Sequence, residues 1–258
     1  MEKTYNPLRL REAFHIEFLR WFARKIKPDY YALKGGVNLR FFFNSFRYSE
    51  DMDLDISAIR VDVLRDTVMT ILQSASFQDS LKPFGIDKIL PPDIAKAKQT
   101  QTTQRFKVHL IAPGGEDFFT KIEFSHRGFK GDRAVESVSN SILREYKLSP
   151  LLVSHYNLIS AITQKIEALA ARTVIQARDI FDLYVLSSQF NSFKAEKIKI
   201  HNGKIKKAYE RIFGINFGQF RDTVIVYLSK EDQGAYNSRS LWDEVKLKVA
   251  NFIEELQR

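Results

Sequence analysis

The sequence reads Lys34-Gly35-Gly36-Val37-Asn38-Leu39-Arg40 and, shortly after, Arg47-Tyr48-Ser49-Glu50-Asp51-Met52-Asp53-Leu54-Asp55, and this stretch decides the fold. In its second part apolar residues alternate with Asp51, Asp53 and Asp55, which is the period-two pattern of a half-buried strand. A strand rises roughly 3.3 Å per residue, so the three carboxylates leave it from the same face. The pattern therefore predicts a strand from Met52 to Ser57 with an acidic face.

Three like charges placed this close repel one another unless a cation lies between them. The glycine pair Gly35-Gly36 opens a short predicted helix that reaches about Phe43, and the free N–H groups at the start of such a helix can face an anion. Glycine also allows the backbone to come close to a phosphate. Carboxylates beside a phosphate cradle indicate a magnesium-dependent phosphoryl or nucleotidyl transferase.

Two other interpretations of the aspartates stay open. A calcium-binding EF-hand loop also begins Asp-x-Asp-x-Asp, but its glycine and glutamate positions hold Ile56 and Asp62 here. The aspartates could instead face water on an edge strand and discourage aggregation, although aspartate is disfavoured in strands. The glycine pair does not belong to a Walker loop, because no Gly-Lys-Ser/Thr follows it.

Two motifs together resemble those of the AbiEii/AbiGii toxin family of nucleotidyltransferases, whose fold is that of DNA polymerase beta. The first motif is matched by Lys34, Gly35, Gly36, Leu39, Arg40, Arg47, Tyr48, Ser49, Asp51 and Asp53. The second is matched by Lys165, Ala168, Leu169, Arg172, Arg178, Asp179, Asp182, Leu183 and Tyr184. Because both motifs occur and in the right order, the resemblance is specific, and it covers about residues 10–190.

The resemblance implies a site for two Mg²⁺ ions held by carboxylates. Asp51 and Asp53 are the expected ligands. Glu123 is the expected third ligand, because it alternates with apolar residues on the strand that follows a predicted hairpin. A glutamate that simply faces solvent is the alternative for Glu123. Asp55 lies farther along the strand, and we expect it behind the metal ligands.

The resemblance also implies a nucleotide pocket. The residues expected to bind the nucleotide are Gly35, Gly36, Arg47, Ser49, Lys165, Arg172 and Asp182. Lys165 and Asp179 are expected to take part in catalysis, with Lys165 as a point charge that neutralises the triphosphate. The alternative is a structural salt-bridge network between two helices, made by Arg172, Arg178, Asp179 and Asp182. Ser49 could likewise serve only to cap a turn.

Composition limits the class of protein. The 258 residues include 44% hydrophobic residues and no cysteine, which describes a folded protein without disulfides or thiolate metal sites. No run of about 18 apolar residues is present, so we expect a cytoplasmic protein with no membrane partner. The net charge of +9 favours polyanions such as RNA. Basic residues are concentrated in positions 194–211, although a solvated helical face would look the same.

The periodicities predict an α+β protein whose C-terminal half is α-helical. The resemblance implies that its first half is a nucleotidyltransferase-fold mixed sheet with flanking helices. The expected domains are 1–138, the catalytic domain, and 139–258, an α-helical domain that completes the active-site cleft. Helices are expected near 8–26, 61–76, 155–172, 176–188, 194–213, 217–228 and 239–256. Strands are expected at 105–111 and 119–125, joined by a turn at Pro113-Gly114-Gly115.

The expected activity is Mg²⁺-dependent transfer of nucleotides from a nucleoside triphosphate (NTP) to an RNA acceptor. The resemblance implies a toxin-like component of a toxin–antitoxin or abortive-infection system, a tRNA 3′ end as the acceptor, and a possible cognate antitoxin as a partner. Two alternatives stay open. One is nucleotidylation of a protein hydroxyl, and the other is a non-catalytic RNA- or protein-binding module.

Overall fold

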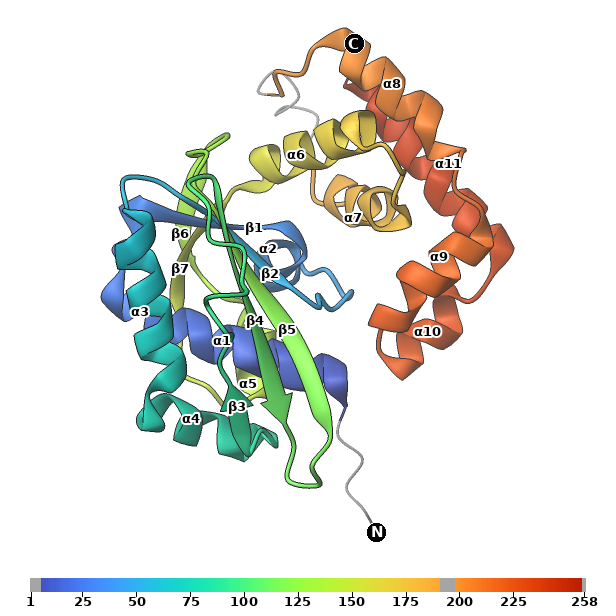
Figure 1. Cartoon of the computed structure of the whole chain (residues 1–258). Coiled ribbons are helices and arrows are strands. Elements are labelled where there is room, and N and C mark those ends of the chain that lie inside the picture. The colour runs from blue at the N-terminus through green and yellow to red at the C-terminus, as the bar shows by residue number, and fades with distance from the viewer. Residues whose placement is uncertain (1–5, 191–197, 257–258) are drawn as a thin grey trace. The chain divides into compact units, whose positions relative to one another are not determined.

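The computed structural model describes residues 6–190 and 198–256 (Figure 1). Contacts divide the chain into two compact units. The sheet unit comprises residues 1–42 and 49–155, and the helical unit comprises residues 43–48 and 156–258. The expected domain division at residue 138 stays a prediction, because compact units need not fold independently.

In the described ranges, no helix combines the length and the apolar character needed to cross a membrane.

The sheet unit is built on a seven-stranded mixed sheet in the order β3-β4-β5-β2-β1-β7-β6. Its strands are β1 (Tyr31–Lys34), β2 (Met52–Ile56), β3 (Lys88–Leu90), β4 (Thr103–Ile111), β5 (Asp117–Ser125), β6 (Arg133–Ser137) and β7 (Leu152–Tyr156). The pairs β2–β5 and β1–β7 are parallel, whereas β1–β2, β3–β4 and β4–β5 are antiparallel. The expected mixed sheet and α+β class are confirmed.

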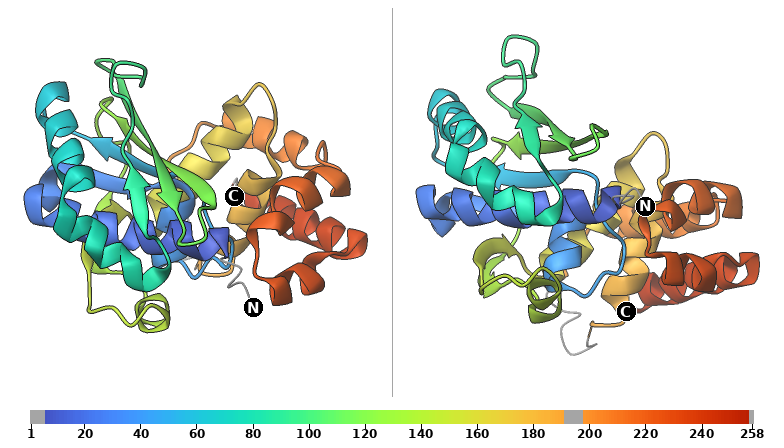
Figure 2. Two further views of the ribbon diagram at one scale, coloured as in Figure 1. Left: turned by 60° about the horizontal axis from the view of Figure 1, so that its bottom comes forward. Right: turned by 90° about the horizontal axis from the view of Figure 1, so that it is seen from below.

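In its described residues the sheet unit has five α-helices, and α1 supplies three of the buried aromatic residues of the core. They are α1 (Pro7–Lys25), α2 (Gly35–Phe42), α3 (Val61–Gln73), α4 (Ala75–Leu81) and α5 (Asn140–Glu145). The Asn6 side chain accepts from the Leu8 N–H at 3.0 Å, which caps the start of α1. Figure 2 shows α1 and α3 from two further sides, and the two helices are in contact.

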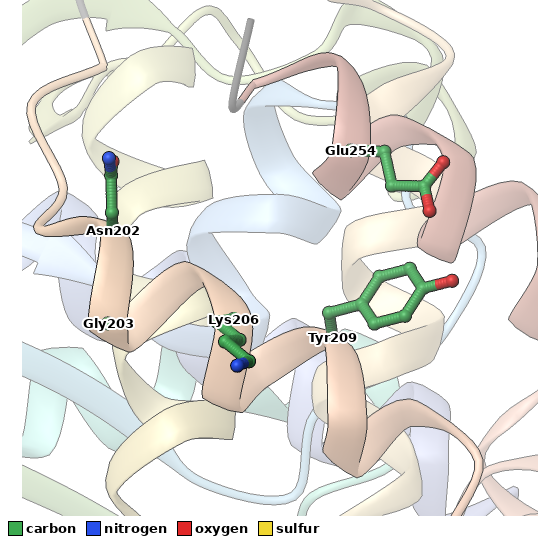
Figure 3. A pocket seen from close by; sticks show the side chains of 5 residues that line it. All are labelled: Asn202, Gly203, Lys206, Tyr209 and Glu254. Atoms are coloured by element: carbon green, nitrogen blue, oxygen red, sulfur yellow. The ribbon is translucent and has the colours of Figure 1, made fainter.

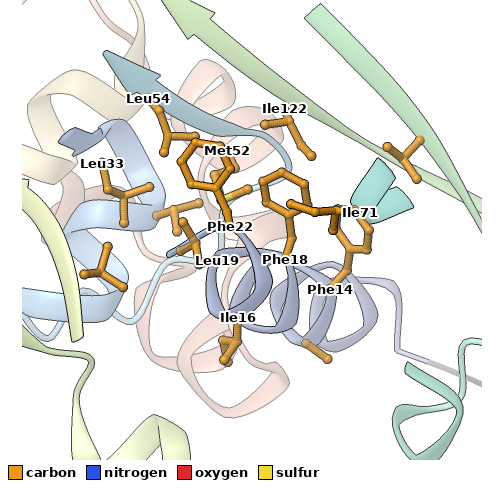
Figure 4. Packing of buried hydrophobic residues seen from close by; sticks show 14 of the residues in the cluster. Phe14, Ile16, Phe18, Leu19, Phe22, Leu33, Met52, Leu54, Ile71 and Ile122 are labelled. Carbon is orange, nitrogen blue, oxygen red and sulfur yellow. The ribbon is translucent and has the colours of Figure 1, made fainter. Parts of the chain in front are cut away.

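The core of the sheet unit forms where one stripe of α1 meets one face of the sheet (Figure 4). Phe14, Phe18 and Phe22 recur every fourth residue and therefore share one side of the helix. They pack with the strand residues Met52 and Leu54, and all five are fully buried. Burial of each such side chain contributes about 1.5–3 kcal/mol. This packing leaves the acidic residues of β2 on the other face of the sheet.

The helical unit contains six α-helices in the ranges that the structure describes. They are α6 (Leu158–Ala171), α7 (Ala177–Ser187), α8 (Asn202–Ile212), α9 (Phe217–Thr223), α10 (Lys230–Tyr236) and α11 (Arg239–Glu255). The stacked rings of Phe220 and Trp242, whose centroids are 4.2 Å apart, join α9 to α11. Segment 43–48 belongs to this unit because Phe46 packs edge-on against Phe181, and because the Tyr48 N–H donates to the Tyr227 carbonyl.

Several elements differ from the expected ones. The expected helix 155–172 begins only at Leu158, because residues up to Tyr156 form β7 and Asn157 caps the helix through the Ser160 N–H. The expected helix 61–76 is two helices, interrupted at Ser74, which caps α4. Of the expected helix 217–228, only the part up to Thr223 is α-helical, and Ile225–Tyr227 form a short 3₁₀ helix. Part of the expected helix 194–213 lies outside the described residues, and the rest begins at Asn202.

Candidate active site

The pairing of the central strands creates a row of alternating charge across the sheet. Asp53 on β2 lies opposite Lys34 on β1 and opposite Glu123 on β5, and Glu123 lies opposite Arg105 on β4. Directly opposite residues share one face of a sheet, so these four side chains lie in line. Asp51 immediately precedes β2 and lies beside this row. We call Asp51, Asp53 and Glu123 the acidic face.

Basic residues partly neutralise the acidic face. The Lys121 ammonium lies 2.7 Å from Asp51 Oδ2, and Arg105 Nε lies 2.5 Å from Glu123 Oε2. Lys34 pairs with Asp55 Oδ1 at 2.5 Å. Asp55 is buried. Its expected place behind the metal ligands stays a prediction. Two of these pairs join neighbouring strands, and the third joins β5 to the residue just before β2, so the sheet holds the local charge in place.

Asp53 is the most perturbed carboxyl group of this face. Burial raises the pKa of Asp53, the positive charge of Lys34 lowers it, and the negative charges of Glu123 and Asp51 raise it further. The net direction is upward, so the ionised form of Asp53 is disfavoured in the folded protein. A cation bound beside Asp53 would remove this penalty, because it would offset both the burial and the repulsion.

The turn from β1 into α2 brings backbone against Asp53. Gly35 has a φ of +70°, in the left-handed region, and a Cβ built on it would lie 2.9 Å from Asp53 Oδ2. Any side chain at this position would therefore be strained and would also push the carboxylate. The sequence predicted that Gly35 and Gly36 bring the backbone close to a phosphate, and this stays a prediction. The neighbour of Gly35 in the structure is the Asp53 carboxylate.

Two residues that the sequence did not indicate hold the segment that leads to Asp51. The Thr120 hydroxyl donates to the Glu50 carbonyl at 2.7 Å and lies 2.8 Å from His15 Nε2. Burial, helped by the charge of Arg11, lowers the pKa of His15 to about 3, so this histidine is neutral near pH 7. Ser49 Oγ donates to the Asp51 carbonyl at 2.8 Å, as a turn-capping serine does. The position of Asp51 is therefore set by hydrogen bonds on both sides.

The residues of the acidic face fit a magnesium site by their chemistry. Mg²⁺ prefers oxygen ligands and is held in proteins by one or two carboxylates together with water and substrate phosphates. Asp53 and Glu123 are direct neighbours, and the charges of Glu123 and Asp51 both act on Asp53. Among the described residues, no three acidic, histidine or cysteine side chains are already gathered in the geometry of a metal site.

The second predicted set of residues forms a separate buried network in the helical unit. Arg47 binds both carboxylate oxygens of Asp182 at 3.0 Å. The Lys165 ammonium lies 2.6 Å from Asp182 and 3.3 Å from Asp179, and Arg172 Nε lies 2.7 Å from Asp179. We call these five residues the ion-pair network. It joins segment 43–48 to α6 and α7.

Pairing decides the direction of the pKa shift of Asp182. Burial alone would raise the pKa of Asp182, but the charges of Arg47 and Lys165 outweigh it and hold this pKa below its ordinary value. Asp179 and Asp182 are fully buried. Arg178, which was a candidate member, is exposed at the start of α7. The sequence did not indicate that Arg47 would pair with Asp182.

Two cavities contain none of the predicted site residues. One, of about 480 Å³, is lined by Asn202, Gly203, Lys206 and Tyr209 on α8 and by Glu254 on α11 (Figure 3). A hydrogen bond to Glu254 raises the pKa of Tyr209, so the phenol stays protonated. The other, of about 880 Å³, lies in the sheet unit, and its lining includes the exposed ion pair Arg9–Glu145. The two carboxylates that line the second cavity, Glu17 and Glu145, each pair with an arginine.

Comparisons with known proteins define the class through the fold. JHP933 from Helicobacter pylori superposes with a TM-score of 0.58 at 18% identity, over 98% of this chain and 93% of that chain. MenT4, a nucleotidyltransferase toxin from Mycobacterium tuberculosis, superposes with a TM-score of 0.57 at 14% identity, over 96% and 84% of the two chains. No curated protein sequence matches the chain. The fold is therefore that of the nucleotidyltransferases.

The family follows from the sequence itself. The profile described as "Nucleotidyl transferase AbiEii toxin, Type IV TA system" matches residues 17–245. The chain belongs to this family of toxin-type nucleotidyltransferases. The resemblance seen in the two motifs is thus confirmed, and the match extends beyond them into α11.

Proposed function

We propose that the chain is a Mg²⁺-dependent nucleotidyltransferase that transfers nucleotides from an NTP to an RNA acceptor, namely a tRNA 3′ end. The observation that carries this proposal is Asp53, a carboxyl group whose pKa is raised and whose direct cross-strand neighbour is a second carboxylate. Perturbed carboxylates of this kind gather where a protein binds a cation or moves a proton.

Asp51, Asp53 and Glu123 are the residues that would hold the magnesium ions, two in number if the site follows the usual two-metal pattern. Mg²⁺ bound there would offset the charge of the triphosphate and make the acceptor hydroxyl easier to deprotonate. Lys34 and Lys121, which now pair with Asp55 and Asp51, keep this face from repelling an anionic substrate. Glu123 would accept the proton of the acceptor hydroxyl.

The nucleotide is proposed to use residues of both motifs. Gly35 and Gly36 would offer backbone N–H groups at the start of α2, and Ser49 would offer its hydroxyl. Lys165 and Arg172 would supply cations to the triphosphate. Arg47, Asp179 and Asp182 would position them, and Asp179 would thereby support catalysis. Lys165 already contacts two buried aspartates, so its ammonium has a defined position before any substrate binds.

The RNA acceptor is supported by charge. The net charge of +9 favours a polyanionic partner, and the described part of α8 adds Lys204, Lys206 and Lys207 on its surface. Of these, Lys204 pairs with Glu167 on α6, so part of this surface serves the fold. A cognate antitoxin as a partner, and the cytoplasm as the location, belong to the same proposal and follow from the family.

One experiment tests the proposal and its alternatives together. The protein is incubated with each labelled NTP and total RNA, with and without Mg²⁺. We expect label in RNA only with Mg²⁺, loss of label in Asp53→Asn, and no loss in Asp62→Asn, whose exposed carboxylate pairs with Arg60. Label on a protein instead of RNA would support protein nucleotidylation. A non-catalytic binding module would label neither RNA nor protein, and NTP with Mg²⁺ would not raise its melting temperature.

A further inference from the structure

The hairpin of β4 and β5 carries an exposed aromatic side chain beside the acidic face. Phe119 is 42% exposed, although phenylalanine in a strand normally faces a core. The register pairs Arg105 with Glu123, Lys107 with Lys121, and His109 with Phe119. These three pairs occupy successive rows on one face, because alternate residues of a strand point the same way. Phe119 is therefore two rows away from Glu123.

Cations surround the Phe119 ring. The Lys107 ammonium lies 4.3 Å from the ring centroid, and the Arg11 guanidinium carbon lies 5.9 Å from it. Arg11 Nε also donates to the Phe119 carbonyl at 2.8 Å, and a second nitrogen of Arg11 pairs with Glu50. With these contacts in place, Phe119 is still partly exposed. Lys121 pairs with Asp51 in the row between Phe119 and Glu123.

We propose that Phe119, together with Arg11, Lys107 and Lys121, forms a platform that binds the single-stranded end of the nucleic-acid acceptor. A base would stack on the Phe119 ring, and its phosphates would contact the cations. An exposed aromatic ring framed by positive charge is the usual surface for single-stranded nucleic acid. This proposal deepens the proposed function, because it says where the acceptor strand lies.

The distance from the platform to the acidic face suits an acceptor strand. Four residues of strand separate Phe119 from Glu123, which corresponds to about 13 Å. Nucleotides that stack about 3.4 Å apart cover this distance within a few residues. The terminal hydroxyl would then lie at the acidic face, while a base a few nucleotides upstream lies on Phe119. An acceptor too short to reach Phe119 cannot use the platform.

Binding without catalysis is the first test. A fluorescent single-stranded RNA of 15 nucleotides is titrated with protein in the absence of NTP, and anisotropy gives Kd. We expect Phe119→Ala to raise Kd about 10-fold or more, and Phe119→Trp to restore binding, because stacking contributes about 1–3 kcal/mol per base. Phe213→Ala is the matched control, since Phe213 is 48% exposed at the end of α8, and it leaves Kd unchanged. Equal melting temperatures exclude misfolding.

A salt titration tests the cations separately. Replacing one phosphate-binding lysine should reduce the slope of log Kd against log salt concentration by about 0.7 for a single strand. We expect this change for Lys107→Ala and no change for Lys230→Ala, a lysine at the start of α10. The platform proposal is wrong if Lys107→Ala leaves the slope unchanged. It is also wrong if Phe119→Ala binds RNA with the Kd of the wild type.

Transfer assays separate this inference from the proposed function. For a 15-nucleotide acceptor we expect Phe119→Ala to raise KM with little change in kcat, and for a dinucleotide acceptor we expect no effect. If the wild type transfers nucleotides to RNA and Phe119→Ala leaves KM unchanged, the platform proposal is wrong and the proposed function stands. RNA binding through Phe119 without any transfer supports the platform and overturns the function. If the wild type neither binds nor labels RNA, both proposals fail.

Discussion

In the sheet unit Asp53 has a carboxylate, Glu123, as its direct cross-strand neighbour, whereas in the helical unit Asp182 has Arg47 and Lys165 as its direct partners. Asp182 is fully buried and Asp53 is partly buried, yet the pKa of Asp53 is raised and that of Asp182 is lowered. Burial acts in the same direction at both, so the neighbours decide the difference. The comparison separates charge that is available to a ligand from charge already neutralised by the fold.

The largest expected effect comes from Asp53→Asn. The substitution removes a proposed metal ligand, so we expect transfer to fall by at least about 10²-fold, equivalent to about 3 kcal/mol or more in the barrier. Stability should stay the same or rise slightly, because one of two repelling carboxylates is gone. Unchanged turnover at saturating Mg²⁺ would contradict the assignment of Asp53 to the metal.

The pH dependence of stability sharpens this prediction. A carboxyl group whose pKa is raised by folding destabilises the folded state when it is ionised. This penalty is absent below the ordinary pKa of 3.8 and complete above the raised value. The stability advantage of Asp53→Asn should therefore be present near pH 7 and disappear on acidification. Urea unfolding at several pH values measures it.

Asp182→Asn should have the opposite effect on stability. The neutral amide would leave Arg47 and Lys165 buried without their shared partner, which costs about 3–5 kcal/mol. The pKa of Asp182 is lowered by folding, so its contribution is present above the ordinary pKa of 3.8 and is lost as pH falls through the lowered value. The difference between wild type and Asp182→Asn in urea should thus shrink in acid. If Asp182→Asn is as stable as the wild type at pH 7, Asp182 does not stabilise the fold, and it does not differ from Asp53 in this respect.

Substitutions of Lys165 test whether the ion-pair network binds the triphosphate in addition to stabilising the contact between helices. If it contacts the triphosphate, Lys165→Ala should reduce turnover by about 10²-fold, or about 3 kcal/mol. The structure adds a stability cost, because Asp179 and Asp182 lose a cation. Lys165→Arg should recover stability more fully than turnover, since a planar guanidinium does not replace a compact ammonium. If Lys165→Arg recovers stability and turnover equally, as measured by melting temperature and kcat, the role of Lys165 is purely structural.

The smallest effect is expected at Thr120. Thr120→Val removes the hydrogen bond to the Glu50 carbonyl and the contact with His15 while keeping the shape of the side chain. We expect a loss of about 1–2 kcal/mol in stability, because two buried polar groups lose their partner. Turnover should fall modestly, since Asp51 follows Glu50. Thr67→Val, at an exposed helix position, is the control, and an equally small effect at both positions would exclude a role for Thr120 in placing Asp51.

The parts of the site with a local signal could be predicted from the sequence. Alternation identified β2 and the β4–β5 hairpin, and it placed Glu123 on the polar side of its strand. The sequence could not show that β5 lies parallel to β2, because strand order depends on contacts between distant residues. For the same reason it missed the Arg47–Asp182 pair, which spans 135 positions, and the support of Thr120 for Glu50, which spans 70. The sequence did not predict β7, and the last two residues of this strand fell within the expected helix 155–172.

Segment 43–48 has a consequence for the order in which the protein is made. The chain enters the helical unit for six residues, returns to the sheet unit at Ser49, and re-enters the helical unit only at Tyr156. Arg47 therefore leaves the ribosome 135 residues before Asp182. At about 5–20 residues per second this is a delay of about 7–27 s. Throughout that delay the segment between α2 and β2 has no partner helix, so the ion-pair network closes late in synthesis, and an incomplete chain that stops before α7 cannot form it.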